Sequence, residues 1–549
     1  MASTLPYETT VQTLPGLMMD VPLLIRNILE HAVRNHPRRE IVSRDGAAIV
    51  RYTYSDFGRR VAQLAHALRK LGVNPGDRVA SFAWNTHRHL ELYYGVPCIG
   101  AVLHTTNIRL FPEQVAELLE HAGDKVVFID GSLIPAMQKA IAARPSLGDL
   151  TFVIMGEATA TLPNSFDYEQ LLASEPQSYD YPNFDENSAA ILCYTSATTG
   201  EPKGALFSHR STVIHAFAIA LTDVFAISQR DVILPIVPQF HVNAWGLPYL
   251  ALMAGAKLVQ PGAGLDPQSV CDLVESEGVT FSAGVPTVWL AARDLMKKTG
   301  RKLTTLKRVV IGGSSVPPAL FDDLADMGIA VIHAWGMTEM SPVGTVSFVK
   351  GELDALSAEA RRKKLLKQGT FSPIVQWKVL DDDGREVPSD GVGRGELYVR
   401  GPAVVREYFN NPHASKAAFE DGWFKTGDIV TVDEDGYMEI VDRSKDMIKS
   451  GGEWISSVDL ENTLMGHPQI KEACVFGLPH EKWMERPVAA VVLREDEVAD
   501  EASIKDWLGT RIAKWWMPDR VVFVDTIPRT GVGKFLKRDL RERYHDLLK

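Results

Sequence analysis

A short run of hydroxyl-bearing residues followed by a lysine is the part of the sequence best suited to bind phosphate. It lies between an apolar segment that ends at residue 194 and a helical pattern that resumes after residue 208, and its members are Thr195, Ser196, Thr198, Thr199, Gly200 and Lys203. Hydroxyls, backbone N–H groups and a cation all offer donors to phosphate oxygens. The spacing is not that of a Walker loop. The run therefore predicts a phosphate loop of another type, with a Thr/Ser-rich surface turn as the alternative.

Five further motifs follow this predicted loop in order along the chain. They are WGMTE at 335–339, GWFKTGD at 422–428, DRSKD at 442–446, GGE at 451–453 and PRTGVGK at 528–534. With these motifs the sequence resembles the adenylate-forming superfamily of acyl-CoA synthetases over essentially its whole length. Within that family it is most similar to bacterial medium- and long-chain fatty acyl-CoA ligases and to methylmercaptopropionate-CoA ligases. The resemblance implies ATP, Mg²⁺ and coenzyme A as cofactors and a small-molecule carboxylic acid as substrate.

The reaction of such an enzyme follows from elementary chemistry. A carboxylate is a poor acylating agent, because its leaving group would be oxide. Attack of the carboxylate on the α-phosphate of ATP gives a mixed anhydride from which AMP leaves easily, and the thiol of coenzyme A then forms a thioester. Negative charge accumulates at the α-phosphate, so fixed cations and N–H donors aimed there stabilise the transition state.

Three residues receive catalytic roles from the resemblance. Lys534, at the end of a Gly-Val-Gly loop, would bridge the acyl carboxylate and the α-phosphate. Thr338 would contact the α-phosphate. Glu339 would hold Mg²⁺, which suits a hard cation that prefers carboxylate and phosphate oxygens. Without the resemblance, Lys534 would be interpreted as a surface residue and Thr338-Glu339 as a common helix start.

The resemblance also places residues around the nucleotide, beginning with the phosphate loop. Asp428 and Arg443 would bind the ribose hydroxyls, and the alternative for Asp428 is a turn residue after Gly427. Trp335 would stack on the adenine, with a place in the core as the alternative. Gly312 and Gly313 would flank the adenine with Trp335, and Gly336 is a further residue of the nucleotide site. Ala197 stands where the family most often has glycine, and it would cost about 1 kcal/mol if that position needs a positive φ.

The two half-reactions take place at one site but need different side chains there. In the family that the sequence resembles, the small C-terminal domain rotates and so exchanges these side chains. The resemblance puts the hinge at Lys445. Rotation would withdraw Lys534 and bring Gly451, Gly452 and Glu453 beside the path of coenzyme A. The sequence is consistent with this, because a polar linker separates two units that can each bury a core.

The resemblance places one wall of the acyl pocket in the apolar segment at 240–246. The residues that the resemblance assigns to the lining of this pocket are His241, Trp245, Val285, Gly312 and Met340. Such a wall suits an aliphatic chain and favours a medium-chain fatty acid, with methylmercaptopropionate or another short acid as the alternative. His241 would orient the carboxylate or simply pack. Whether Trp245 closes the pocket or swings aside for longer chains stays open.

Composition excludes several other classes of protein. The 549 residues carry a net charge of −11, which disfavours nucleic-acid binding. The four cysteines are far apart and predict reduced thiols in a cytoplasmic protein. The longest apolar run, at 244–256, is shorter than the roughly 20 residues of a membrane span, so no transmembrane segment is expected. A homodimer is possible.

The pattern of elements predicts an α/β fold with two domains. Residues 78–107 and 231–261 repeat a strand-helix-strand pattern with a Gly-Ala corner, which indicates two related α/β subdomains. A small β unit should follow at about 370–442, with Asp-Gly turns at 383–384 and 435–436. We therefore expect an N-terminal domain at 1–442 that binds ATP and the acyl group. A small, mobile α+β domain at 443–549 would carry Lys534.

Two rival functions share parts of this pattern. One is a nucleotide-binding regulatory or scaffold protein that has lost turnover, but such a protein would not need Lys534, Glu339, Thr338 and Asp428 together. The other is a luciferase-like oxidase or an enzyme that adenylates a carrier protein. It would share the first half-reaction only, so its product formation would not depend on coenzyme A.

Overall fold

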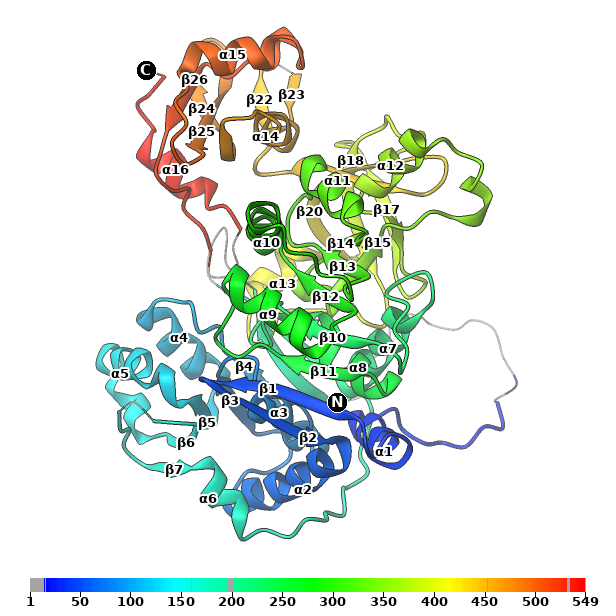
Figure 1. Ribbon diagram of the computed structural model, residues 1–549, viewed down its shortest axis with the longest axis vertical. Helices are drawn as coiled ribbons and strands as arrows, with labels where there is room; N and C mark the ends of the chain where they lie inside the picture. The colour runs from blue at the N-terminus through cyan, green and yellow to red at the C-terminus, as the bar shows by residue number, and fades with distance from the viewer. Residues whose placement is uncertain are drawn as a thin grey trace.

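A seven-stranded sheet forms one half of the frame of the N-terminal part (Figure 1). The computed structural model describes residues 14, 16–158, 160–195, 202–451, 453–530 and 534–548. In order across the sheet the strands are β7 (Ser165–Asp167), β6 (Thr151–Met155), β5 (Asp124–Asp130), β3 (Arg78–Phe82), β4 (Val102–Thr105), β8 (Ala189–Tyr194) and β9 (Gly204–Ser208). All neighbouring pairs are parallel except β8 and β9, which flank the predicted phosphate loop.

A nine-stranded sheet forms the other half. Its order is β16 (Thr370–Phe371), β15 (Val343–Val346), β14 (Ala330–Gly336), β13 (Arg308–Ile311), β12 (Phe281–Gly284), β10 (Val232–Pro235), β11 (Lys257–Gln260), β1 (Glu40–Asp45) and β2 (Ala48–Thr53). The strands from β14 to β1 are parallel, and the two edges are antiparallel.

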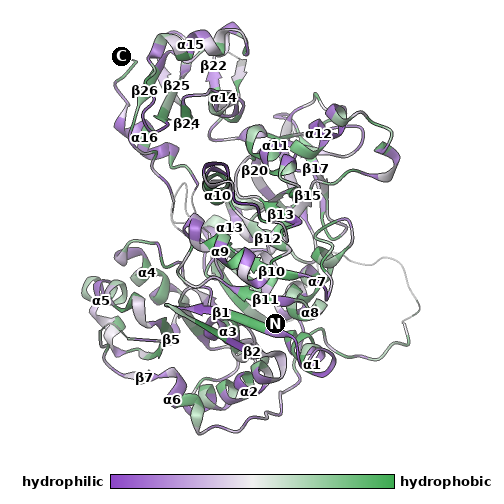
Figure 2. Cartoon of the chain, in the orientation of Figure 1, coloured by the Kyte–Doolittle hydropathy of each residue, from purple (hydrophilic) through white to green (hydrophobic). Residues whose placement is uncertain are grey.

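Helices cover both faces of both sheets, so helix and sheet layers alternate (Figure 1). The central layer packs between the sheets and contains α1 (Ile25–Asn35), α2 (Tyr54–Lys70), α3 (His87–Cys98), α7 (His209–Ala220) and α8 (Leu247–Ala254). The outer face of the nine-stranded sheet is covered by α9 (Pro267–Glu277), α10 (Pro286–Thr299) and α11 (Pro318–Asp326). The outer face of the seven-stranded sheet carries α4 (Pro112–Ala122) and α5 (Ile134–Ala143). Hydrophobic residues concentrate on the strands, whereas α2 shows a hydrophilic outer face (Figure 2).

The repeated pattern in the sequence is confirmed as a repeated unit of structure. Strands β3 and β4 pair in parallel around α3, as β10 and β11 do around α8. Both corners have a glycine in the left-handed region, Gly100 with φ 80° and Gly255 with φ 67°. A side chain at Gly255 would collide with the ring of His36, 2.5 Å away. The α/β fold class with two related subdomains is therefore confirmed.

Two smaller units complete the fold, one with an antiparallel sheet and one with a sheet that is antiparallel except for the β25–β26 pair. The β unit contains β17 (Gln376–Leu380), β18 (Gly395–Arg400), β19 (Phe419–Glu420), β20 (Trp423–Val432) and β21 (Met438–Arg443). The sheet of the C-terminal unit contains β22 (Ile448–Ser450), β23 (Glu453–Ile455), β24 (Ile470–His480), β25 (Met484–Leu493) and β26 (Arg520–Phe523). Residues 444–447 connect the two sheets, and the predicted boundary after residue 442 lies one residue before the end of β21. The C-terminal unit stands at the top of Figure 1.

The remaining helices, apart from α6 in the seven-stranded half, lie in or near these two units. They are α6 (Tyr168–Ala173) beside α2, α12 (Ala358–Leu366), α13 (Pro412–Ala418), α14 (Ser457–Met465), α15 (Glu501–Gly509) and α16 (Lys537–Arg543). α15 ends at Gly509, and a separate 3₁₀ turn covers Lys514–Trp516. None of the helices in the described ranges is long and apolar enough to cross a membrane. All four cysteines are buried and unpaired.

Candidate functional site

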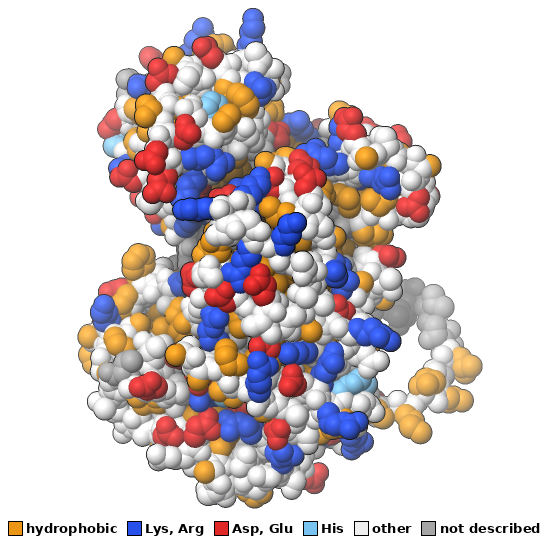
Figure 3. All heavy atoms as spheres, viewed as in Figure 1, with side chains coloured by type: hydrophobic (Ala, Val, Ile, Leu, Met, Phe, Trp, Pro, Cys, Tyr) orange, Lys and Arg blue, Asp and Glu red, His pale blue; other side chains and the backbone are white. Residues whose placement is uncertain are grey.

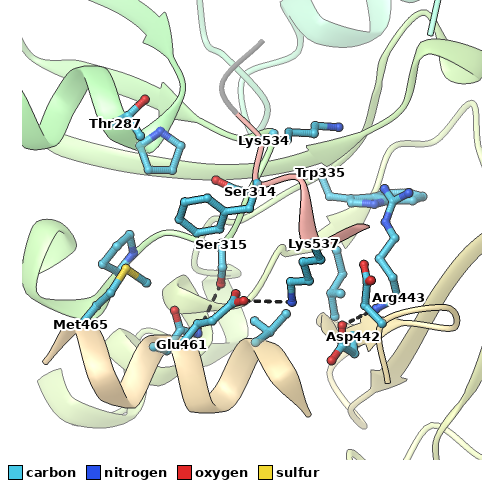
Figure 4. Close-up of a pocket in the computed structure, with 18 of the residues that line it drawn as sticks. Thr287, Ser314, Ser315, Trp335, Asp442, Arg443, Glu461, Met465, Lys534 and Lys537 are labelled. Carbon is cyan, nitrogen blue, oxygen red and sulfur yellow. Dashed lines mark hydrogen bonds and ion pairs between the residues drawn. The ribbon is translucent and has the colours of Figure 1, made fainter. Parts of the chain in front are cut away.

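Most of the predicted site residues follow the carboxyl ends of parallel strands, where α/β proteins bind ligands. Thr195 follows β8, Val285 follows β12, and Gly312 and Gly313 follow β13, while Gly336 ends β14. Two adjoining cavities open at this edge. The larger cavity lies between the large unit and the C-terminal unit, and residues from both units line it (Figure 4). Gly313, Trp335, Gly336 and Lys534 line both cavities.

Asp428, on β20, connects β14 and β21 in the wall of the larger cavity. Its carboxylate is 1% exposed and accepts a hydrogen bond from Trp335 Nε1 at 2.9 Å through Oδ2. Its Oδ1 pairs with Arg443 Nε at 2.7 Å, and the two residues are opposite each other on β20 and β21. The structure thus brings Asp428, Arg443 and Trp335 together as predicted. Trp335 also packs in the apolar core of the β unit, so it combines a core position with a place in the cavity wall; stacking on adenine stays a prediction.

Lys534 reaches the junction of the two cavities from the C-terminal unit (Figure 4). The turn that carries it is closed by Thr530, whose N–H donates to the Lys534 carbonyl at 2.8 Å and whose Oγ1 accepts from Lys534 N at 3.2 Å. Burial, together with the nearby charge of Arg443, lowers the pKa of Lys534 to about 8. Asp428 and Glu339 oppose this shift. The cavity thus contains a lysine that titrates near neutral pH.

Glu339 is held by a residue that no motif indicated. The Tyr408 hydroxyl donates to Glu339 Oε1 at 2.7 Å, and burial with the adjacent carboxylate raises the pKa of Tyr408. Lys203 Nζ lies 5.0 Å from the centre of the Tyr408 ring, within the range of a cation–π contact. Glu339 Oε2 has no hydrogen-bond partner among the described residues. Tyr408 therefore places Glu339 and Lys203 on the same side of the site.

The base of the predicted phosphate loop is a closed turn. Thr195 N–H donates to the Lys203 carbonyl at 3.0 Å, and Lys203 N–H donates to Thr195 Oγ1 at 3.1 Å. Phe409 N–H also donates to the carbonyl of Gly204 at 2.8 Å. The predicted positions Ser196, Ala197, Thr198, Thr199 and Gly200 lie outside the described residues.

The smaller cavity contains most of the predicted acyl pocket. His241, Trp245, Val285 and Gly312 all line it, and Lys534 is its one charged member among the described residues. Burial and the charge of Lys534 lower the pKa of His241 to about 3, so its imidazole is neutral. A side chain at Gly312 would be 2.7 Å from the Ala334 carbonyl, so glycine lets this wall close. Met340 does not reach the cavity, because it is buried in the core of the β unit.

One wall of this cavity is a turn with an unusual backbone. Four consecutive non-glycine residues, from Val242 to Trp245, have φ between 45° and 57°, and Gly246 follows with φ 81°. Such a conformation costs roughly 1–2 kcal/mol per residue, so the surroundings must hold it. His215 contributes: its Nε2 accepts from Val343 N–H at 3.1 Å, and a side chain at Gly246 would be 2.9 Å from its Nδ1. Burial lowers the pKa of His215 to about 3, which keeps Nε2 an acceptor.

The predicted loop for coenzyme A lies apart from both cavities. Gly451 has φ 61°, its N–H donates to the Trp483 carbonyl at 2.9 Å, and a side chain there would be 2.7 Å from the Trp483 ring. Gly452 lies outside the described residues, and so does the side chain of Glu453. Lys445, the predicted hinge residue, is exposed in the connection between β21 and β22 and lines the larger cavity. The structure therefore brings Lys534, but not Gly451, to the site.

We predict that Tyr408→Phe destabilises the protein by about 1–3 kcal/mol, because Glu339 Oε1 would lose its donor at a residue that is 5% exposed. The midpoint of denaturant unfolding measures this effect. Tyr179→Phe is a matched control, since the Tyr179 hydroxyl only accepts from Arg69 Nε at 3.4 Å. Equal midpoints for the two variants would contradict the anchoring role of Tyr408.

Comparison with known proteins identifies the family. Residues 29–409 match the AMP-binding enzyme family, and residues 459–534 match the AMP-binding enzyme C-terminal domain. The chain is 48% identical to the long-chain-fatty-acid–CoA ligase of Thermus thermophilus, over 96% of this chain and 97% of that protein. It is 45% identical to the 3-methylmercaptopropionyl-CoA ligase of Ruegeria lacuscaerulensis (97% and 99% covered) and 44% identical to the medium-chain-fatty-acid–CoA ligase of Ectopseudomonas oleovorans (97% and 98%).

A solved structure has the same architecture along the whole chain. The ATP-bound MatB of Rhodopseudomonas palustris superposes with a TM-score of 0.82 at 26% identity, over 96% of this chain and 100% of that one. The match includes both the large unit and the C-terminal unit. The resemblance inferred from the motifs is thus confirmed, and the chain belongs to the AMP-binding, adenylate-forming enzyme family.

Proposed function

We propose that the protein is an AMP-forming acyl-CoA synthetase that converts a medium-chain fatty acid to its coenzyme A thioester. Use of ATP and coenzyme A follows from the family. The observation that carries the proposal is the position of Lys534, at the junction of a cavity with the Asp428–Arg443 pair and a cavity with an apolar wall. A cation at this junction can contact a carboxylate in one cavity and a phosphate in the other.

In the first half-reaction the carboxylate attacks the α-phosphorus of ATP and pyrophosphate leaves. Lys534 would stabilise the charge that develops on the carboxylate and α-phosphate oxygens, and Thr338, which lines the acyl cavity, would donate to the same phosphate. Asp428 and Arg443 would bind the ribose, with Trp335 against the adenine. The hydroxyls of the loop at 195–200 and Lys203 would hold the phosphates. His241, being neutral, would donate a hydrogen bond to the acyl carboxylate without an ion pair.

Glu339 is suited to hold Mg²⁺ with the phosphates. One of its oxygens is fixed by Tyr408, and the other has no partner among the described residues. Within the described ranges, no three His, Cys, Asp or Glu residues are grouped as a metal site. Mg²⁺ is commonly held by one or two carboxylates plus substrate phosphates, so a single carboxylate fits it. When bound, Mg²⁺ would neutralise charge on the phosphates.

In the second half-reaction the thiol of coenzyme A attacks the acyl carbonyl and AMP leaves. Lys534 now occupies the site and Gly451 is remote from it, so the C-terminal unit would have to turn. The connection at 444–447, with Lys445 as the hinge, would absorb the turn. Gly451, Gly452 and Glu453 would then form the side of the path for the pantetheine arm.

The apolar lining of the smaller cavity supports a medium-chain acid. Apart from Lys534, its described lining has no charged residue that would meet a polar tail. Two of the relatives named above are fatty-acid–CoA ligases. A short acid such as methylmercaptopropionate is the second candidate, because another relative of similar identity is named for it and Trp245 could shorten the cavity.

A homodimer in the cytoplasm is the assembly and location that we propose. The segment before α1 exposes Leu17, Met18 and Met19 to 89–99%, and it projects from the body at the right of Figure 3 with its apolar side chains uncovered. Exposed apolar side chains in a cluster mark interaction sites, and a second copy of the chain would cover them. Sedimentation velocity would test the dimer, and a monomer at micromolar concentration would contradict it. Cell fractionation would test the location.

We predict a pH dependence for the first half-reaction from the pKa of Lys534. Because the folded protein holds this pKa at about 8, kcat/KM for acyl-AMP formation should be constant at lower pH and fall above about pH 8, as the charged form is lost. Lys534→Arg keeps its charge and should lose this alkaline decline. Lys534→Ala should lower acyl-AMP formation about 10²–10³-fold and spare thioester formation from supplied acyl-AMP. Equal loss in both half-reactions would contradict the role.

The acyl specificity is predicted from the apolar lining of the smaller cavity. Each buried methylene contributes about 0.8 kcal/mol, so kcat/KM should rise about fourfold per carbon from butyrate towards octanoate and then level off. Trp245→Ala should move the optimum to longer chains. CoA-dependent AMP release with a panel of acids measures the profile. A preference for methylmercaptopropionate over hexanoate and octanoate would contradict the fatty-acid assignment, and product formation independent of coenzyme A would contradict the ligase.

A further inference from the structure

A buried chain of polar contacts joins the large unit to the C-terminal unit beside the hinge. Asp442, near the end of β21, and Ser457, at the start of α14, are at most 1% exposed. Asp442 Oδ2 accepts from Ser457 N–H at 2.6 Å and from Ser457 Oγ at 2.7 Å. The preceding Ser456 Oγ donates to the Val441 carbonyl at 2.6 Å. The first turn of α14 is therefore fixed to the last strand of the β unit.

The chain continues from Ser457 to the start of α16, directly after the turn that carries Lys534. Lys537, three residues further along, donates from Nζ to Ser457 Oγ at 2.5 Å and pairs with Glu461 Oε1 at 2.8 Å. Glu461 Oε1 also accepts from Val475 N–H at 2.8 Å, so the pair is anchored to β24. The nearby carboxylates raise the pKa of Lys537, which stays charged. Ser457 Oγ thus donates to one unit and accepts from the segment of Lys534.

We propose that Ser457 is a positioning residue for the first half-reaction, because its hydroxyl couples Asp442 in the large unit to Lys537 and so fixes the turn that presents Lys534. This inference rests on the proposed function. It concerns the placement of Lys534, since Ser457 lines neither cavity and contacts no reacting atom. Loss of the hydroxyl would leave the Asp442 contact to Ser457 N–H and remove the link to Lys537.

The residues of this polar chain lie on both sides of the hinge in the sequence. Asp442 precedes Lys445, whereas Ser457, Glu461 and Lys537 all follow it. A rotation about Lys445 would separate Asp442 from Ser457, and the other three residues would move together. The contact of Asp442 with Ser457 therefore belongs to the arrangement that places Lys534 at the site. Weakening it should slow the step that needs Lys534 and spare the step that needs Lys534 withdrawn.

The test separates the two half-reactions of Ser457→Ala. Acyl-AMP formation, followed by pyrophosphate exchange with octanoate, should fall about tenfold, which is what one buried hydrogen bond can supply. Thioester formation from supplied octanoyl-AMP and coenzyme A should stay within about twofold of the parent protein. Ser457→Thr, which keeps the hydroxyl, should restore acyl-AMP formation. Thr463→Ala is the matched control on the same helix, because Thr463 Oγ1 only donates to the Asp459 carbonyl at 2.8 Å.

A second variant keeps the test decisive if Ser457→Ala folds poorly. Asp442→Asn removes the charge of the side chain and keeps its shape. Like Ser457→Ala, it should slow acyl-AMP formation, and its midpoint of thermal unfolding should stay within a few degrees of the parent protein. Equal losses in both half-reactions, or none in either, would overturn the positioning role. If the parent protein makes no thioester from any acid, the proposed function fails instead, and that outcome is seen before any variant is measured.

Discussion

The carboxylate of Asp428 is the contact on which the geometry of the site depends. It bonds to Trp335 at the end of a strand of the nine-stranded sheet and to Arg443 at the last position of the β unit. A carboxylate that is 1% exposed is costly unless both its oxygens are paired. The β unit is therefore locked against the sheet at the edge of the larger cavity. The connection to the C-terminal unit begins from this fixed point, one residue beyond Arg443.

The charge around the larger cavity differs from that of the whole chain. The protein carries a net charge of −11, yet the cavity lining contains eight Lys or Arg residues and five Asp or Glu residues. Such a local excess of cations attracts anionic ligands such as nucleotides and raises their concentration at the site. Most of these cations belong to the C-terminal unit. The electrostatic potential at the nucleotide would consequently change when the C-terminal unit turns. The contribution of the charges on the large unit would stay the same.

Sequence reasoning succeeded where the signal is local or where motifs occur in a fixed order. The strand-helix-strand repeat and the β unit were predictable from hydrophobic patterns and turn residues. The motifs assigned Asp428 and Arg443 to the same ligand, but their ion pair was not predicted. Tyr408 was not predictable, because a tyrosine in an irregular segment has no pattern that indicates a contact 69 residues away. The left-handed turn at Val242–Trp245 was not predictable either, since valine, alanine and tryptophan give no signal of positive φ. Met340 follows directly on the WGMTE motif, yet packing turns its side chain into the core.

The left-handed turn also limits which substitutions can change the shape of the acyl cavity. Its four non-glycine residues already adopt a conformation that β-branched side chains resist most, and Gly246 has no room for a side chain beside His215. Gly312 on the facing wall is similarly confined by the Ala334 carbonyl. New acyl preferences are therefore more accessible through the size of Val237, Val285 and Val343, which line the same cavity from ordinary backbone. A library of variants at these three positions would change the shape of the cavity without disturbing the backbone that encloses it.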